Sequence, residues 1–275
     1  MAMKNLFGII ALFLCSVGII SCSNDDKPEP TPFHLEKQSY EIRFGFTGDI
    51  SIKNGSGDIS VSVRNPEIVS VSYLKNDVYT DRLGLVSLQG KQKGETKVVI
   101  TDNITKESEE VNVKVIDSYL ACTIMESNHP ALTKNPPIYM YLVKNEARDC
   151  YFFVYSDASH SLKEGPIAHG TYNFSKEEEG DVSYPCLTLT YAEENGKFTD
   201  AAVSPTTHKF NLTGTEDRVF DILNHYLNFN LNRAFTRMNI APVYRLNMKE
   251  IGTEYAVFGE INMTPIPEGV LNKSN

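Results

Sequence analysis

The stretch that decides the fold is residues 59–74, ISVSVRNPEIVSVSYL, in which two alternating runs flank Asn65-Pro66. In Ile59–Val63, and again within the predicted strand Ile68–Leu74, apolar residues recur at every second position with Ser between them. A period of two predicts strands with one buried face and one face in water. Pro66 sets the backbone at the entry to the second run. The stretch therefore predicts two consecutive β-strands joined by a turn.

The same pattern extends in both directions and covers residues 34–116. Asn54-Gly55 predicts a two-residue hairpin between the second and third runs, because both residues tolerate positive φ. The remaining predicted strands are Tyr40–Arg43, Ile50–Lys53, Leu85–Leu88, Lys97–Thr101 and Val111–Val115. Seven strands in about 83 residues are typical of an immunoglobulin-like (Ig-like) β-sandwich.

Four motifs in this region carry a family resemblance. They are Asn65–Val71, Gly84–Gly90, Lys93–Thr101 and Val111–Val115. Together they resemble the bacterial Ig-like group 2 domain, which has an N-P-x-V-A-x-V strand, a G-x-V strand, a G-T-x-x-I-T arm and a V-x-V end strand. The chain departs from that pattern by lacking the Trp that many members place before the N-P turn.

The resemblance covers about a third of the chain and implies a spacer or an adhesive module on a surface protein. It implies no catalytic residues. Because a fold likeness does not specify a function, both the spacer and the adhesive interpretation stay open.

The N-terminus has the pattern of an export signal. Lys4 precedes an apolar run of about 15 residues, Leu6–Ile20, which is short for a membrane-spanning helix and fits the h-region of a signal peptide. The tetrapeptide Ile19-Ile20-Ser21-Cys22 resembles the lipobox of bacterial lipoproteins. The resemblance implies that residues 1–21 are removed and that Cys22 carries the lipid. A retained transmembrane anchor and an ordinary signal with a chance Cys are the alternatives.

Residues 22–33 predict a stiff acidic tether, since they contain three prolines and three acids before Phe33. Asp25 and Asp26 look like the acidic signal that sends lipoproteins to the outer face of the outer membrane; a plain spacer is the alternative. We therefore expect an outer-membrane, lipid-anchored protein facing the cell exterior rather than the periplasm.

Composition and charge narrow the function classes. The chain has 41% apolar and 22% charged residues, which is ordinary for a globular protein. Its 26 basic residues face 35 acidic ones, with no basic cluster of the kind that nucleic-acid binding needs. Loss of residues 1–21 removes Lys4 and no acid, so the mature chain has 25 basic and 35 acidic residues, a net charge of −10. We expect membrane contact through the lipid alone and no nucleic-acid partner.

Residues 117–275 form a second β-rich module of no recognised family, either barrel-like or α+β. Asn195-Gly196 predicts a hairpin turn. One helix is expected to start at Thr213-Gly214-Thr215-Glu216, which has capping-box spacing, and to end near Leu227. The predicted strands are Leu120–Met125, Ile138–Val143, Tyr151–Tyr155, Gly170–Phe174, Cys186–Tyr191, Lys209–Leu212, Val243–Met248 and Tyr255–Met263. The whole chain is thus predicted to be mainly β, a sandwich followed by a β-rich module with one helix.

An aromatic stripe is the candidate ligand-binding surface of this module, where 11 of the 14 Tyr and nine of the 14 Phe of the chain lie. Its members are Tyr139, Tyr141, Tyr151, Phe153 and Tyr155, and strand alternation places those of each run on one face. Such a face could stack on sugar rings or line a ligand cavity. The alternative is a packing surface in which Tyr serves as an ordinary strand residue.

No catalytic residue, metal ligand or cofactor is predicted, because no motif with tight ligand or nucleophile spacing occurs in the chain. His160, Glu164 and His169 could join a metal site, but solvated loop histidines are the favoured interpretation. Of the other three mature cysteines, Cys122, Cys150 and Cys186, two could form a disulfide in an oxidising envelope, or all three could be buried thiols.

These observations favour a non-catalytic surface lipoprotein whose Ig-like module presents a C-terminal module that binds a glycan or a protein. An envelope hydrolase with a site formed only in the fold, and a subunit of a surface assembly, are the alternatives.

Overall fold

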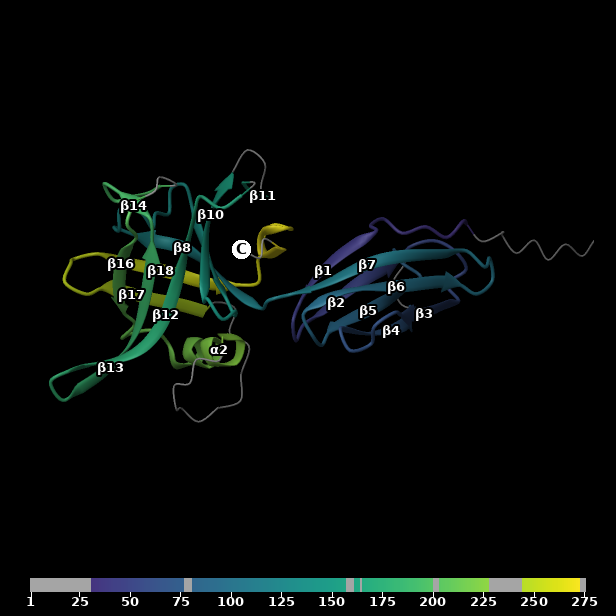
Figure 1. Ribbon diagram of the computed structural model, residues 1–275, viewed down its shortest axis with the longest axis horizontal. Coiled ribbons are helices and arrows are strands. Elements are labelled where there is room, and N and C mark those ends of the chain that lie inside the picture. The colour runs from purple at the N-terminus through teal and green to yellow at the C-terminus, as the bar shows by residue number, and fades with distance from the viewer. Residues whose placement is uncertain are drawn as a thin grey trace, which may run out of the picture.

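The computed structural model describes residues 31–76, 81–156, 161–163, 165–199, 203–227 and 244–272. The predicted signal peptide, Cys22, most of the tether, His160 and Glu164 lie outside these residues. The described chain is mainly β, as the sequence predicts, and forms two modules joined end to end (Figure 1). Within the described residues, no helix is long and apolar enough to cross a membrane.

The first module is a seven-stranded sandwich of two sheets. One sheet has the order β1 (Ser39–Arg43), β7 (Ser108–Ile116), β6 (Gly94–Asp102) and β3 (Ile59–Val63), and β1 pairs with β7 in parallel. The other has the order β2 (Thr47–Ile52), β5 (Gly84–Gly90) and β4 (Val69–Lys75). Side chains such as Ile52, Val69 and Ile100 are fully buried between the sheets, because the period of two places every second residue inward. Phe33, which the sequence assigns to the tether, is also buried in this core.

The predicted hairpin at Asn54-Gly55 is wrong. β2 pairs with β5 and β3 pairs with β6, so Asn54-Gly55 carries the chain from one sheet to the other. Gly55 does adopt positive φ, +87°, as such a turn requires. The dipeptide therefore specified a turn correctly, but which strands pair across it depends on how the two apolar faces pack.

The second module is a closed barrel of eight strands, which decides between the barrel-like and α+β alternatives. The ring closes because β10 pairs with both β12 and β9. In order around the barrel the strands are β10 (Asp149–Ser156), β12 (Ala168–Glu179), β13 (Val182–Tyr191), β16 (Thr206–Asn211), β17 (Tyr244–Glu250), β18 (Ala256–Asn262), β8 (Tyr119–Ser127) and β9 (Ile138–Val143).

Smaller elements complete this module. β11 (Ser161–Leu162) pairs in antiparallel with the end of β10. β14 (Glu193–Glu194) and β15 (Lys197–Phe198) form the hairpin that Asn195-Gly196 predicts, in which these two residues have φ of +53° and +72°. A short 3-10 helix, η1, spans Val270–Asn272.

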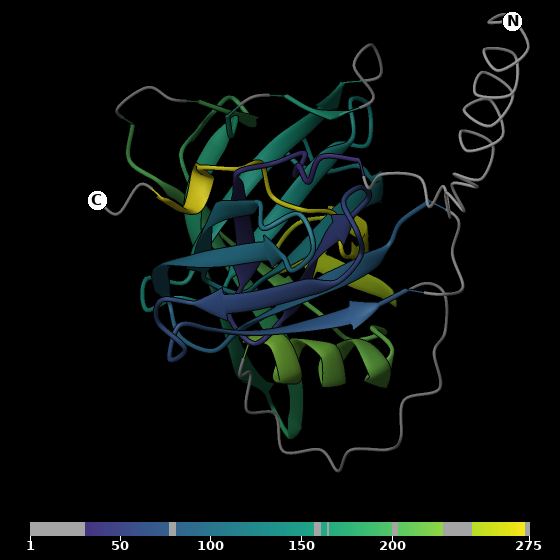
Figure 2. The same cartoon turned by 90° about the vertical axis from the view of Figure 1, so that its right-hand side faces the viewer.

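The helix α2 (Asp217–Leu227) closes one mouth of the barrel, at the bottom in Figure 1 and again in Figure 2. Its buried residues Val219, Phe220, Ile222 and Leu223 join the barrel core. The predicted capping box does not form. The helix begins only at Asp217, four residues beyond Thr213. The Thr215 hydroxyl accepts a hydrogen bond from the Asn247 N–H and donates one to the Asn247 carbonyl on β17.

The junction between the modules is short and well connected. β7 ends at Ile116 and β8 begins at Tyr119. The Arg43 guanidinium donates to the Tyr119 carbonyl at 3.2 Å and lies 3.9 Å from the centroid of the Phe46 ring. Phe46 stacks in turn on Tyr226 of α2, with ring centroids 5.3 Å apart. These contacts bind the end of the sandwich to both the barrel wall and α2.

Candidate functional site

The aromatic stripe lies on the outer wall of the barrel. Its members alternate with interior residues such as Phe152, and adjacent strands bring Tyr151 opposite Tyr141 and Phe153 opposite Tyr139. The single predicted face therefore exists.

Much of that face is covered by the chain's own C-terminal segment. Tyr141 and Phe153 are fully buried in a second core with Tyr119 and Ile266. The Tyr141 hydroxyl donates to the Pro265 carbonyl at 3.2 Å, and Ile266 N–H donates to the Tyr119 hydroxyl at 3.0 Å. A ligand could therefore reach only the three outer members of the stripe, Tyr139, Tyr151 and Tyr155, while the centre serves packing.

The three described cysteines are all free and buried, so the structure corrects the disulfide expectation and agrees with the alternative of three thiols. Cys122 on β8 and Cys150 on β10 both face the barrel interior, but β9 lies between their strands. The strands that carry the two cysteines are therefore about 10 Å apart, which is too far for a disulfide to bridge. Burial raises the pKa of Cys122 to about 12 and that of Cys150 well above its usual value, which leaves both thiols unreactive.

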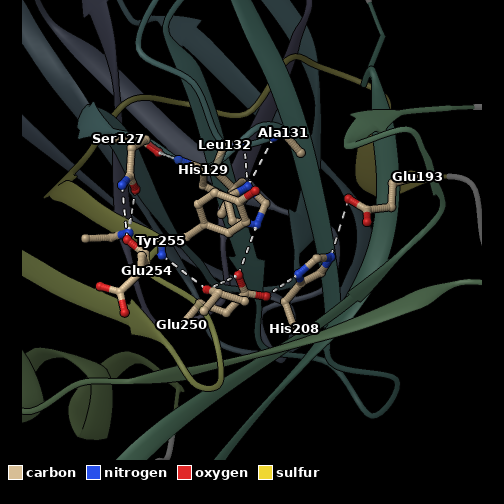
Figure 3. Close-up of polar contacts among 12 residues, drawn as sticks. Ser127, His129, Ala131, Leu132, Glu193, His208, Glu250, Glu254 and Tyr255 are labelled. Atoms are coloured by element: carbon tan, nitrogen blue, oxygen red, sulfur yellow. Dashed lines mark hydrogen bonds and ion pairs between the residues drawn. The ribbon is translucent and has the colours of Figure 1, made fainter.

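A cluster of histidine and glutamate side chains closes the barrel mouth opposite α2, and sequence spacing gave no sign of it (Figure 3). His208 comes from β16, Glu250 from the end of β17, Glu193 from β14, and His129 from the loop after β8. The side chains of His129, His208, Glu250 and Glu193 are only 0%, 9%, 10% and 15% exposed. Four segments that are distant in sequence therefore meet at one buried polar centre.

His208 lies between two carboxylates. Its Nδ1 is 2.7 Å from Glu250 Oε1, and its Nε2 is 3.4 Å from Glu193 Oε2. Only the contact with Glu250 has hydrogen-bond geometry, because His208 Nε2 and Glu193 Oε2 each lack a hydrogen-bond partner among the described residues. The ring also stacks on Tyr191, with centroids 4.9 Å apart and planes 14° apart. Glu250 accepts a further hydrogen bond from the Thr253 hydroxyl, 2.9 Å away.

His129 has a different role, because its loop determines its tautomer. Its Nδ1 accepts hydrogen bonds from the backbone N–H groups of Ala131 and Leu132, at 3.1 and 3.2 Å. The proton of the neutral ring must then be on Nε2, which faces Glu250 Oε2 at 4.0 Å. Burial, and secondly the charge of His208, lower the pKa of His129 to about 4, against an opposing effect of Glu250. The ring therefore stays neutral at physiological pH.

The ligand atoms of the cluster are close enough together to bind a metal ion, but the protonation of His129 does not suit one. One ligand atom each from His129, His208 and Glu250 lie within 4.8 Å of one another, and His129 Nε2 has no hydrogen-bond partner. A zinc-binding histidine coordinates through an unprotonated nitrogen. Both nitrogens of His129 fail this condition, since Nδ1 is occupied by two N–H donors and Nε2 carries the proton. The geometry favours a hydrogen-bonded polar plug over a metal centre.

Little in the sequence could have revealed this cluster. His208 and Glu250 are 42 residues apart, and only the antiparallel pairing of β16 with β17 brings them together. The one local signal is that His208 occupies an inward position in the alternation that ends at the buried Phe210. A histidine at an apolar position predicts a buried partner but does not say which.

Comparisons with known proteins give only distant likenesses. No protein-family model matches the chain, and no curated protein is similar to it. Among solved structures it is similar to domains 4 and 5 of the S-layer protein SbsC, with 16% identity over 31% of this chain and 51% of that one, at a TM-score of 0.26. It thus spans about half the length of that structure. Domains 5–6 of the same protein match with 14% identity over 66% of this chain and 96% of that one, also at 0.26. Likenesses at this level carry no inference about function.

Proposed function

We propose that the chain is a non-catalytic lipoprotein of the outer membrane, displayed on the cell surface, in which the sandwich is a spacer and the barrel module binds an external glycan or protein. The observation that carries the proposal is the order of the segments along the chain. A lipobox and an acidic tether precede a sandwich that is entered at one end and left at the other.

The chain enters the sandwich at the end farthest from the barrel (Figure 1). There, the Phe33 N–H donates to Glu107 at 2.6 Å and the Gly55 N–H donates to the Thr31 hydroxyl at 3.3 Å. The chain leaves at the opposite end, where Ser118 donates to the Phe44 carbonyl at 2.5 Å. β7, with nine residues, spans about 30 Å at about 3.4 Å per residue. The sandwich therefore holds the barrel about 30 Å beyond the tether.

The anchor would be the lipid alone. A mature chain of net charge −10 is repelled by anionic lipids, whereas each buried acyl methylene contributes about 0.8 kcal/mol. The non-catalytic part of the proposal is supported by the burial of the histidine–glutamate cluster and by the high pKa values of Cys122 and Cys150.

The lipid anchor is tested by substituting Cys22 and Cys15 separately with Ser. We expect Cys22→Ser to abolish incorporation of a labelled fatty acid and to release the protein from the membrane fraction. Cys15→Ser, inside the signal segment, is the matched control and should change neither. Equal labelling of both variants would contradict the assignment of Cys22.

Display at the surface is tested on intact cells by adding a protease. We expect the protein to be degraded while a periplasmic marker survives. Asp25→Ala with Asp26→Ala should protect it if the two acids act as an export signal. Full protection of the unsubstituted protein would place the barrel in the periplasm and refute surface display.

One structural feature favours the assembly alternative. The hairpin of β12 and β13 projects beyond the barrel (Figure 1). In the described ladders, residues 173–179 of β12 pair only with β13, and residues 182–184 of β13 pair only with β12. Val182 at the tip is 66% exposed. Such a ribbon offers strand edges to another copy. Sedimentation at increasing concentration tests this, and a monomer at all concentrations would oppose it.

A further inference from the structure

A groove of about 910 Å³ lies at the junction of the two modules. Lys91, Gln92 and Lys93 line it from the turn between β5 and β6 of the sandwich. Residues 144–146 and Arg148 line it from the turn between β9 and β10 of the barrel, and Leu227 from the end of α2. Because both modules supply its walls, the groove is complete only when they are joined.

The lining of the groove is basic, whereas the protein as a whole is acidic. Four cationic side chains, Lys91, Lys93, Lys144 and Arg148, face two carboxylates, Asp117 and Glu146. Lys93 pairs with Asp117 at 2.8 Å, and the Arg148 guanidinium donates to Asn173. The groove lining has an excess of two positive charges, which Asp149, directly after Arg148, reduces to one over the extended surface. The full chain has a formal charge of −9, so this local excess departs from its surroundings and favours an anionic ligand.

The junction contacts keep the two walls in place. Phe44, which also lines the groove from the sandwich, accepts a hydrogen bond at its carbonyl from the Ser118 hydroxyl, 2.5 Å away. The Lys144 N–H donates to the Ser118 carbonyl at 2.7 Å. Ser118 thus links Phe44 on the sandwich wall to Lys144 on the barrel wall. Walls held together by such contacts are pre-organised, so the groove loses little entropy on binding.

An aromatic surface continues from the groove along β10. Asp149 follows the basic turn directly, and its carboxylate holds His169 at 2.8 Å. His169 stacks on Tyr151, with centroids 4.5 Å and planes 12° apart. Asp149 and Tyr151 share one face of the strand, because they are two residues apart. Basic side chains beside flat rings suit a sugar polymer with carboxylate groups better than an extended acidic peptide.

We propose that the junction groove binds a carboxylated polysaccharide, with the cationic residues pairing with the carboxylates and the Tyr151–His169 surface contacting sugar rings. This inference rests on the proposed function, of which it specifies the ligand class and the site.

The test uses residues 22–275 with Cys22→Ser, so that the full mature chain is soluble. Polygalacturonate oligomers are titrated by calorimetry, with neutral dextran oligomers and poly-glutamate as comparison probes. We expect binding of polygalacturonate alone, weakening as salt is raised. Lys93→Gln with Arg148→Gln should reduce the affinity about 10-fold. Lys134→Gln with Lys197→Gln, exposed lysines outside the groove, makes the same charge change and should leave it unaltered.

Each outcome decides the proposal, provided that the variants keep the unfolding temperature of the parent. Equal affinity of both double variants would overturn the groove as the site. Tighter binding of poly-glutamate would overturn the polysaccharide in favour of an acidic protein. Binding of dextran alone would overturn the charge argument, and no binding of any probe would overturn the ligand class. None of these results affects fatty-acid labelling or protease accessibility, so the anchor and display can be judged separately.

Discussion

The sandwich and the barrel each bury a polar centre, and the two centres are built from different chemistry. In the sandwich, Asp102 is fully buried and accepts hydrogen bonds from the Ser56 N–H and hydroxyl, at 2.5 and 2.6 Å, and from Ile104 and Thr105 N–H, at 2.9 and 3.1 Å. In the barrel, the histidine–glutamate cluster consists of titratable side chains that face one another.

The difference lies in what happens to each centre when protons are added. Burial alone would raise the pKa of Asp102, but the hydrogen bonds from Ser56, Thr105 and Ile104 lower it to about 2. Those donors do not titrate, so this centre keeps its charge over almost the whole pH range. The barrel centre, by contrast, is stable only while the buried His129 ring is neutral. The charged Asp102 and the neutral His129 therefore make the two modules differ in their sensitivity to acid.

The largest effect should come from breaking the barrel centre at Glu250. Glu250→Ala leaves His208 without its 2.7 Å partner and Thr253 without its acceptor. Loss of one partner of a buried ion pair costs about 4 kcal/mol of unfolding free energy. The measurement is hydrogen exchange of barrel amides, with the exposed Glu254→Ala as the control. A loss below about 1 kcal/mol, the size of a surface pair, would show that the cluster is not a stabilising centre.

Removal of the sandwich centre should cost somewhat less. Asp102→Ala deprives three backbone N–H groups of their acceptor, and we expect a loss of about 3 kcal/mol confined to sandwich amides. The exposed Asp49→Ala on β2 serves as the control. An equal loss in barrel amides would mean that the two modules unfold as one unit and that their centres cannot be compared separately.

Acid should destabilise the barrel at a higher pH than the sandwich. The pKa of His129 is about 4 in the folded barrel and 6.5 in the unfolded chain, so the unfolded state binds the additional proton. Barrel stability should therefore be complete above pH 6.5 and fall as the pH drops toward 4, by about 2 kcal/mol at pH 5. For Asp102 the folded pKa of about 2 lies below 3.8, so the sandwich loses that contribution only between pH 3.8 and 2.

The matched variant for this experiment is His129→Asn. An Asn side-chain oxygen can accept the N–H groups of Ala131 and Leu132 as Nδ1 does, but it does not titrate. Hydrogen exchange at pH 7 and pH 5 should show the barrel of the parent weakening and that of the variant unchanged. If the parent and the variant lose the same amount, His129 is not the acid-sensitive group.

The smallest predicted effect concerns space around Asp102. A Cβ at Gly55 would lie 2.5 Å from Asp102 Oδ2, whereas a Cβ at Gly45 meets nothing within 4 Å, although both glycines have φ near +80°. Gly45→Ala should therefore cost about 1 kcal/mol from backbone strain alone, and Gly55→Ala about 2 kcal/mol. Thermal unfolding of the two variants measures the difference. Equal losses of stability in the two variants would show that the loop around Asp102 can move to accommodate the added methyl group.

The sequence by itself determined the class of fold and most of the strands. Period-two alternation depends only on neighbouring residues, so Ile59–Val63 and Ile138–Val143 were predicted with the bounds that the structure shows. Asn195-Gly196 likewise predicted its hairpin, because positive φ at two consecutive residues is a local property.

Tertiary structure decided what local rules leave open. Asn54-Gly55 has the same residues as Asn195-Gly196 but joins two sheets, because the partners of β2 and β3 are set by packing of the whole sandwich. Covering of the aromatic stripe by Ile266 depends on a contact between residues more than 100 positions apart. The histidine–glutamate cluster and the junction groove arise in the same way, since barrel closure and docking of the modules place side chains together that no spacing along the chain relates.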